Sequence, residues 1–185
     1  MKTKYVLLLT VFVIVLTLQS SQADAQGAYV GPQLGIYSAK DADKAKLMGG
    51  VVLRLPTSLG IDLEGSINYR AENYAGGGVT VRSWPIMITA LVYPLSIIYG
   101  AIGAGWYNTT FDYDKMIIGQ DIVSETKLQT AWHFGGGIDV PIGTSAKLVG
   151  DMRYVFLNYD FKQFPGSSSL NSNFYVIMIG LLFGL

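Results

Sequence analysis

The chain has 185 residues, 13 basic and 13 acidic side chains and no cysteine. The balanced charge gives no reason to expect a nucleic acid partner, and the lack of cysteine excludes a disulfide scaffold, thiol catalysis and cysteine-based metal sites. Half of the residues are hydrophobic, but no apolar run reaches the roughly 20 residues that a membrane-spanning helix needs.

Residues 1–25 have the features of a secretory signal peptide. Two lysines lie in the first four residues, an apolar run extends from Tyr5 to Leu18, and Ala23-Asp24-Ala25 matches a signal peptidase site. We therefore expect cleavage after Ala25 and a single mature domain of residues 26–185. An exported, apolar chain without a spanning helix points to a β-barrel in an outer membrane.

Eight segments of this domain alternate between apolar residues and polar or small residues, which is the period of a β-strand. In residues 60–70, for example, Ile61 and Leu63 share one face while Asp62 and Glu64 share the other. The predicted strands cover residues 28–37, 47–55, 60–70, 79–93, 97–108, 127–140, 146–156 and 173–185. We expect the apolar faces to contact lipid and the polar, glycine-rich faces to line a narrow interior.

The connections alternate in length along the chain. Tight turns are expected at Pro56, Pro94 and Pro141, and longer loops at residues 38–46, 71–78, 109–126 and 158–172. This is the asymmetry between short periplasmic turns and long extracellular loops of outer-membrane barrels. Aromatic residues near strand ends are expected in interfacial girdles; these are Tyr37, Tyr69, Trp84, Tyr93, Trp106, Trp132, Tyr154, Tyr175 and Phe183.

The charged residues on the inward faces form the first candidate site. An eight-stranded barrel is just wide enough for side chains to fill, so a charge inside it must be paired. We expect an interior network of ion pairs and hydrogen bonds, and the alternative is a narrow or gated ion path. The network is predicted to contain Arg54, Asp62, Glu64, Arg70, Arg82, His133, Asp139, Lys147, Asp151 and Arg153.

His133 is the only histidine and the only candidate for a catalytic base of a lipid-modifying barrel. Nucleophilic hydrolysis would need a serine within hydrogen-bond reach, but the residue two positions later is Gly135. A hydrogen-bonded interior histidine is therefore favoured. One histidine without cysteine offers too few ligands for a transition metal, and neither glycine triplet precedes a helix as a phosphate loop would. No catalytic residue, metal or cofactor is predicted.

The long loops contain aromatic and aliphatic residues that form the second candidate site. Exposed apolar loop residues can mark a binding surface, although packing against the barrel rim would explain them equally well. The candidate loop contacts are Phe111, Tyr113, Ile117, Ile118, Phe161 and Phe164.

Three segments resemble the small outer-membrane β-barrel domain family, which includes the transmembrane domain of outer-membrane protein A. They are WPIMITALVYP, IIYGAIGAGWY and the hairpin WHFGGGIDVPIG…AKLVGDMRYVF, and the resemblance covers residues 28–185. One departure is the final residue, Leu185, where such proteins usually end on an aromatic residue. The resemblance implies a structural or adhesive role through the loops that follow Asn108 and Leu157. It also implies contact with outer-membrane lipid and lipopolysaccharide, insertion by the barrel-assembly machinery and a possible extracellular ligand.

Together these patterns predict an all-β, eight-stranded, antiparallel, up-and-down transmembrane barrel that is not an enzyme. Three alternatives remain open at this point. They are a narrow pore or small-ligand carrier, a lipid A-modifying enzyme, and a soluble periplasmic barrel of lipocalin type.

Overall fold

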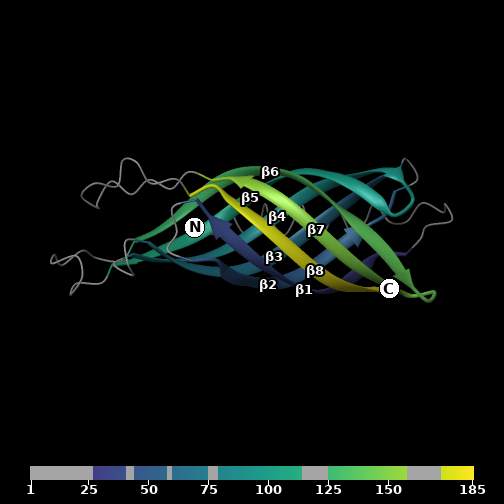
Figure 1. Cartoon of the computed structure of the whole chain (residues 1–185), viewed down its shortest axis with the longest axis horizontal. Helices are drawn as coiled ribbons and strands as arrows, with labels where there is room; N and C mark the ends of the chain where they lie inside the picture. Colours follow the sequence, from purple (N-terminus) through teal and green to yellow (C-terminus); the bar gives the residue numbers. More distant parts are fainter. Residues whose placement is uncertain (1–26, 41–43, 58–59, 75–78, 114–124, 158–171) are drawn as a thin grey trace, which may run out of the picture.

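Eight antiparallel strands form one closed barrel in the residues that the computed structural model describes, which are 27–40, 44–57, 60–74, 79–113, 125–157 and 172–185 (Figure 1). The strands are β1 (Tyr29–Ala39), β2 (Lys46–Leu55), β3 (Ile61–Tyr74), β4 (Val79–Leu95), β5 (Ile98–Tyr113), β6 (Glu125–Ile142), β7 (Ala146–Phe156) and β8 (Phe174–Gly184). Each strand pairs with its neighbours in sequence, and β1 pairs with β8. The predicted eight-stranded up-and-down barrel is confirmed. The predicted signal peptide lies outside the described residues.

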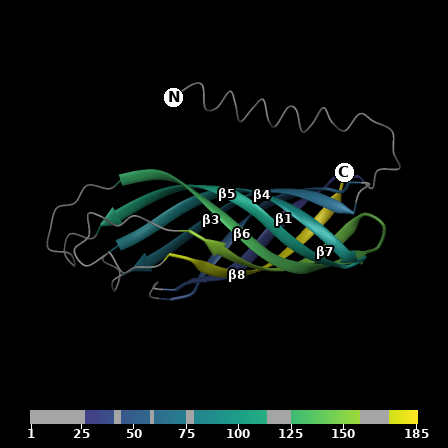
Figure 2. The ribbon, with the colours of Figure 1, turned by 90° about the horizontal axis from the view of Figure 1, so that it is seen from above.

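The two ends of the barrel differ. The chain turns between β2 and β3, β4 and β5, and β6 and β7 at one end, here called the turn end, where Gly143 has a positive φ of 66°. Both ends of the described chain meet there, because the Leu185 amide donates to the Ala28 carbonyl (2.8 Å). The longer connections are at the other end, here called the loop end, where β6 projects past β8 (Figure 2).

Strands β3 to β6 are longer than predicted; β3, β5 and β6 are extended at the loop end, and β4 is extended at the turn end. They contain 14, 17, 16 and 18 residues, whereas the other four strands contain 10 or 11. The loops predicted at residues 71–78 and 109–126 are therefore too long, because ladder pairing continues to Tyr74↔Val79 and Phe111↔Glu125. These stretches have the composition of a loop, since the outer face of a strand no longer has to be apolar beyond the lipid.

Large apolar side chains point away from the barrel on all sides. Leu34, Ile102 and Ile179 are 59%, 59% and 62% exposed, and water contact would cost about 25 cal/mol for each Å² of such surface. A continuous apolar surface of this kind belongs in lipid, whereas a soluble barrel of lipocalin type would turn its apolar residues inward. Among the described residues, no helix is long and apolar enough to cross a membrane.

Most of the predicted girdle residues face outward, but two predictions were wrong. Tyr37 is only 1% exposed and lies inside the barrel, and the Tyr93 hydroxyl is bonded to interior residues. Both residues occupy odd-numbered positions on strands whose odd-numbered residues face inward. Their positions near a strand end suggested that they belong to a girdle. Their positions in the inward–outward alternation of the strand instead direct both side chains into the barrel.

Inward-facing glycines of β6 make room for side chains of the neighbouring strands. A Cβ atom at Gly135 would lie 2.9 Å from Cγ of Arg153, and one at Gly137 would lie 2.5 Å from Cζ of Tyr99. Both hypothetical Cβ atoms would also collide with a backbone carbonyl oxygen of β7. The glycine-rich run therefore provides the space in which Arg153 and Tyr99 lie.

The Gly137→Ala variant is expected to be less stable than the wild type by about 1–3 kcal/mol, the usual cost of overpacking a filled interior. The matched control is Gly100→Ala, because a Cβ at Gly100 meets no atom within 4 Å. Urea unfolding in lipid vesicles, followed by the mobility difference between boiled and unboiled samples, measures both. Equal unfolding midpoints for the two variants would contradict the close packing at Gly137.

Candidate functional site: the closed interior

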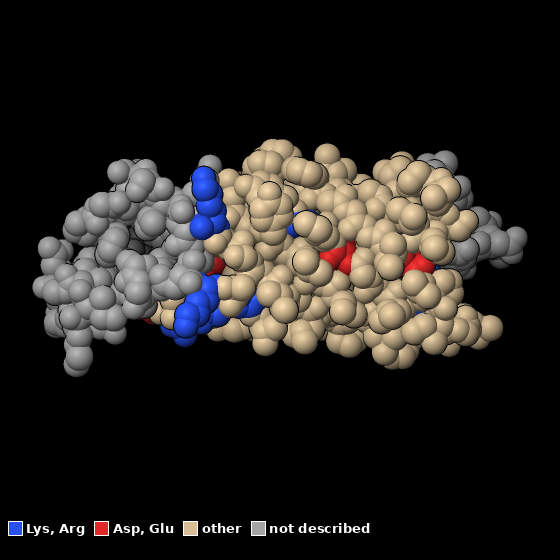
Figure 3. All heavy atoms as spheres, viewed as in Figure 1, with Lys and Arg blue, Asp and Glu red and all other residues tan. Residues whose placement is uncertain are grey.

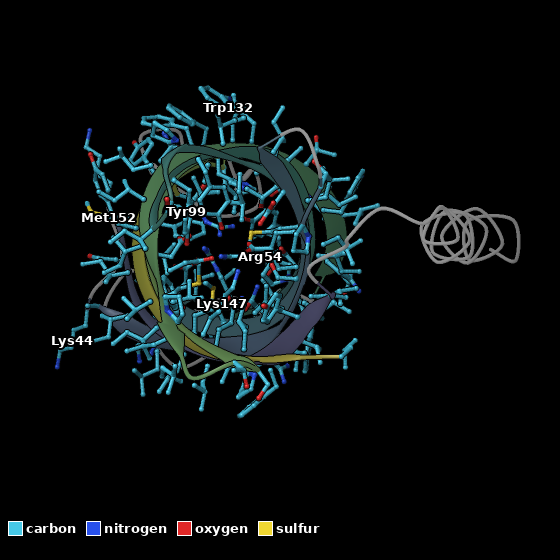
Figure 4. The ribbon with its side chains drawn as sticks, turned by 90° about the vertical axis from the view of Figure 1, so that its right-hand side faces the viewer. Lys44, Arg54, Tyr99, Trp132, Lys147 and Met152 are labelled. Atoms are coloured by element: carbon cyan, nitrogen blue, oxygen red, sulfur yellow. The ribbon has the colours of Figure 1, made fainter. Side chains whose placement is uncertain are left out.

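The barrel interior contains the candidate site. Viewed from the turn end, Arg54, Tyr99 and Lys147 point into the barrel, while Trp132 and Met152 point outward (Figure 4). The alternation of each strand sets these directions, and closure of the sheet brings the inward faces of all eight strands together.

Glu64 lies between two arginines at the centre of this interior. Arg54 Nη2 donates to Glu64 Oε2 (2.6 Å), and Arg153 Nη2 donates to Glu64 Oε1 (2.7 Å). Arg54 and Glu64 are direct partners across β2 and β3, whereas Arg153 reaches across from β7. The three side chains are only 1–2% exposed. One carboxylate therefore joins opposite walls of the barrel.

Two further carboxylates extend the network. Arg54 Nη1 donates to Asp139 Oδ1 (2.5 Å), and Arg153 makes paired bonds to the two oxygens of Asp151 (2.7 and 2.8 Å). Lys147 Nζ lies 3.7 Å from Asp139 Oδ2. Along this chain of contacts the residues are Lys147, Asp139, Arg54, Glu64, Arg153 and Asp151. Positive and negative groups alternate, so three cations balance three carboxylates, as buried charges require.

Neutral side chains that were not predicted complete the network. The Tyr93 hydroxyl donates to Asp139 Oδ2 (2.8 Å), and the Tyr99 hydroxyl donates to Asp151 Oδ2 (2.9 Å). Arg153 Nη1 donates to Thr89 Oγ1 (3.0 Å). These hydroxyl groups satisfy carboxylate oxygens and guanidinium protons that the ion pairs leave over. The inward positions of β4 and β5 could have identified them, but only charged residues were predicted as members of the network.

His133 is buried beside this network. Its Nε2 atom lies 3.0 Å from Thr89 Oγ1, and no described residue bonds to its Nδ1 atom. The imidazole has 0% exposure and packs over Gly103, where a Cβ atom would lie 2.9 Å from its Cε1. The hydroxyl group next to the histidine therefore belongs to Thr89 and not to a serine. This hydroxyl oxygen already accepts a hydrogen bond from Arg153. The described residues contain no group of three or more potential metal ligands.

A second ion pair, Arg70–Glu72, is buried nearer the loop end with 0% exposure of both side chains. The Arg70 guanidinium lies 4.0 Å from the ring centre of Phe174 and 4.9 Å from that of Tyr37. Such cation–π contacts favour a buried guanidinium. This half of the interior is otherwise largely apolar, and its members include Met48, Val79, Val81, Met87, Tyr107, Phe111, Val155, Leu157, Val176 and Met178.

Nine of the ten predicted network residues point inward, although they do not form a single cluster. Asp62 is 7% exposed near the turn end and receives a backbone hydrogen bond from Thr57. Arg82 was assigned wrongly, because it is 52% exposed on the outer surface and pairs with Asp112 (2.6 Å). It lies between Trp84 and the loop end of β4, where an outward charge can reach water or lipid headgroups.

The predicted loop contacts are also corrected in part. Phe111 is not a loop residue, because it lies in β5 and is 2% exposed inside the barrel. Tyr113 is the last residue of β5. Ile117, Ile118, Phe161 and Phe164 lie outside the described residues.

The interior is closed rather than open. A water-filled pore would expose the charged residues that line it, yet Arg54, Glu64, Arg70, Glu72 and Arg153 are at most 2% exposed. Side chains from opposite walls are in hydrogen-bond contact across the barrel. These hydrogen bonds hold the opposite walls together, and no continuous water-filled path runs beside these residues.

Replacing Glu64 by Gln is expected to destabilise the barrel by at least about 3 kcal/mol, because two buried guanidinium groups lose the carboxylate between them. The matched control is Arg82→Gln, which breaks an exposed ion pair worth at most about 1 kcal/mol. Unfolding free energies in vesicles measure the difference. Equal losses in the two variants would show that Glu64 does not hold the network together.

Comparisons with known proteins agree with this architecture. Neisserial surface protein A superposes with a TM-score of 0.60 at 11% identity, over 88% of this chain and 100% of that one. OprG of Pseudomonas aeruginosa gives a TM-score of 0.55 at 16% identity, over 87% and 97% of the two chains. Ail, the attachment invasion locus protein of Yersinia pestis, gives 0.51 at 14% identity, over 86% and 97%. A search of curated proteins gave no significant match.

The structural likenesses have low sequence identity and therefore show the fold alone. The family comparison is more informative, because the outer membrane protein beta-barrel domain family matches residues 7–183. This match spans nearly the whole chain, and the apolar exterior and filled interior are those of a small transmembrane barrel. The chain therefore belongs to the outer membrane protein beta-barrel domain family.

Proposed function

We propose that this outer-membrane protein is not an enzyme, does not conduct ions and has a structural or adhesive role through its loop end. The observation that carries the proposal is the closed interior, in which Glu64 pairs with Arg54 and Arg153 and all three side chains are 1–2% exposed. Binding of an extracellular partner would then fall to the loop end, which has the longer connections and the projecting strands β3 to β6.

The position of His133 supports the non-enzymatic part of the proposal. A lipid A-modifying barrel would need a base that an acyl or sugar group can reach, but this imidazole is buried inside the barrel. Its hydroxyl neighbour, Thr89, is also only 1% exposed. A lipid substrate could approach neither group without displacing the packed interior.

The adhesive part of the proposal rests on the surface of the loop end. Ail is named an attachment invasion locus protein, and that name describes Ail alone. In this chain, the outer face of the projecting strands carries the polar side chains of Arg82, Asn108, Thr126 and Thr130, with Leu128 exposed among them. A barrel wall that continues past the lipid can present loops at a distance from the membrane surface.

Purified barrels in a planar bilayer are expected to show no sustained conductance, because the network closes the interior. The positive control is Glu64→Ala combined with Arg153→Ala, which removes two of the side chains that cross the barrel and should produce ion-conducting events. Steady single-channel currents from the unaltered protein would overturn the non-conducting part of the proposal. The intact mass of the purified chain would also report whether residues 1–25 have been removed.

Replacing residues 114–124 and 158–171 by short Gly-Ser linkers is expected to abolish any attachment to host cells or matrix that expression confers. The barrel should still fold, as judged by gel mobility before and after boiling. The control is a Gly-Ser replacement of Gly143-Thr144-Ser145 at the turn end. Attachment that survives the loop replacement, or expression that confers none, would exclude the adhesive role. A barrel-dependent change in outer-membrane permeability would then support the structural one.

A further inference from the structure

The His133 side chain is a buried group of the interior that can change its charge under mildly acid conditions, because an ordinary histidine gains a proton near about pH 6.5. Its imidazole has 0% exposure, and its direct partners on β5 and β7 are Gly103 and Val155. A Cβ atom at Gly103 would lie 2.7 Å from His133 Nε2, so the ring fills the space over this glycine. The imidazole therefore cannot reach water unless the packing changes.

The hydrogen bonds of Thr89 set the position of the histidine proton. Arg153 Nη1 lies 3.0 Å from Thr89 Oγ1 and can only donate, because a guanidinium group has no acceptor atom. Among the described residues, His133 Nε2, also 3.0 Å away, is the acceptor for the Thr89 hydroxyl proton. The single proton of the neutral ring is then on Nδ1, to which no described residue bonds.

Arg153 is the charged group that the structure connects to this ring. Both bonds of Thr89 Oγ1 are 3.0 Å long, so Arg153 Nη1 and His133 Nε2 are at most 6.0 Å apart. The carboxylates on this side, Glu64 on β3 and Asp151 on β7, are both bonded to Arg153. The inward residues around the imidazole on β4 to β7 are otherwise uncharged; they are Thr89, Ala101, Gly103, Ala131, Gly135 and Val155.

The remaining inward charges lie farther along the barrel and have neighbours of their own. Arg54, Asp139, Lys147 and Asp62 lie towards the turn end, and the Arg70–Glu72 pair lies towards the loop end. On the outside, the flank drawn in Figure 3 is largely uncharged between the two ends. A charge on His133 would therefore be opposed mainly by Arg153.

A second proton on the ring would bind Nε2 and reverse the bond to Thr89. The hydroxyl oxygen would then face two cationic donors, the imidazolium and the Arg153 guanidinium, and its own proton would lose its acceptor. Two positive charges at this separation disfavour each other, most strongly where water is excluded. The network of three cations and three carboxylates would also gain one uncompensated charge.

The bond between Arg153 and Thr89 is the contact that this charge would break. Arg153 also pairs with Asp151 and Glu64, and bonds between two ionised groups are stronger than a bond to a neutral hydroxyl. The imidazolium would have no carboxylate of its own, because both carboxylates on this side stay with Arg153. Water would then have to enter to solvate it.

We propose that His133 and Thr89 form an acid-sensitive latch of the barrel interior. At neutral pH the imidazole accepts the Thr89 proton and the interior stays packed. In acid, a proton on His133 Nε2 releases Arg153 from Thr89, and water and small ions enter beside the imidazolium. The latch rests on the closed interior proposed above, which describes the protein at neutral pH.

Nitrogen-15 NMR of the untagged chain tests the proton positions, because His133 is the only histidine. Histidine-labelled protein in lipid nanodiscs at neutral pH is expected to have a protonated Nδ1 and an unprotonated Nε2. Thr89→Ser keeps the hydroxyl group and should keep this tautomer, whereas Thr89→Val should raise the fraction protonated at Nε2. A wild-type ring protonated at Nε2, or no difference between the two variants, would overturn the latch.

Urea unfolding in vesicles between about pH 7.5 and about pH 4.5 tests the response to acid. The unfolded histidine gains a proton below about pH 6.5 while the buried ring stays neutral, so acid favours unfolding. Relative to His133→Gln, the unfolding equilibrium constant of the wild type should rise up to about tenfold for each further pH unit.

The matched control for this experiment adds Thr126→His to the His133→Gln protein. Thr126 lies on the exposed outer side of the same strand, so a histidine there should restore none of the acid response. The gel mobility shift on boiling verifies that every variant is folded. Parallel pH profiles for the wild type and His133→Gln would show that the buried imidazole is not the acid-sensitive group.

Planar-bilayer recordings separate the latch from the closed state at neutral pH. The wild type should show ion-conducting events in acid and none at neutral pH, and His133→Gln should show none in either condition. A wild type that does not conduct in acid would overturn the latch and leave the proposed closed interior intact. Currents through the wild type at neutral pH would contradict the closed interior itself.

Discussion

The structure depends on filling a narrow interior with side chains whose charges are paired. Eight strands close around a space that only side chains can occupy, and an unpaired charge there would cost several kcal/mol. Glu64 meets this constraint by binding Arg54 on one side and Arg153 on the other. Asp139 and Asp151 then neutralise the remaining charge of the arginines. The same contacts that stabilise the closed sheet also fill the space between its walls, so the stability of the sheet and the burial of these charged residues have one physical cause.

The outer surface has the opposite constraint, because lipid allows neither charges nor unpaired backbone groups. Apolar side chains cover the strands up to the ring pairs Tyr69–Trp84 and Trp132–Phe156. Beyond Trp84 the constraint ends, and Arg82 can face outward with Asp112. This change of surroundings explains why β3, β5 and β6 continue past the strand ends that were predicted at the loop end.

Much of the candidate site followed from alternation alone. Inward positions on β3, β6 and β7 were predicted correctly for Glu64, Asp139 and Arg153, because a one-residue slip would turn a charge towards lipid. The failures at Tyr37 and Tyr93 arose where a position near a strand end outweighed the alternation. Arg82 was assigned inward because of its charge, although it lies beyond Trp84, where a charge can face outward. Phe111 was missed for a related reason, since its polar neighbours made a paired strand resemble a loop.

The sequence by itself determined the strand count, most of the inward and outward positions and the class of protein, because each depends on local periodicity and on the solvent that each face can tolerate. It could not determine which carboxylate binds which guanidinium. Glu64 and Arg153 are 89 residues apart in the chain, and the closure and register of the sheet bring them within hydrogen-bond distance. The outward ring contacts Trp132–Phe156 and Tyr154–Tyr175 likewise exist only because β6, β7 and β8 align these rings side by side. Tertiary structure decided these features, because they are distances between strands and no single strand specifies them.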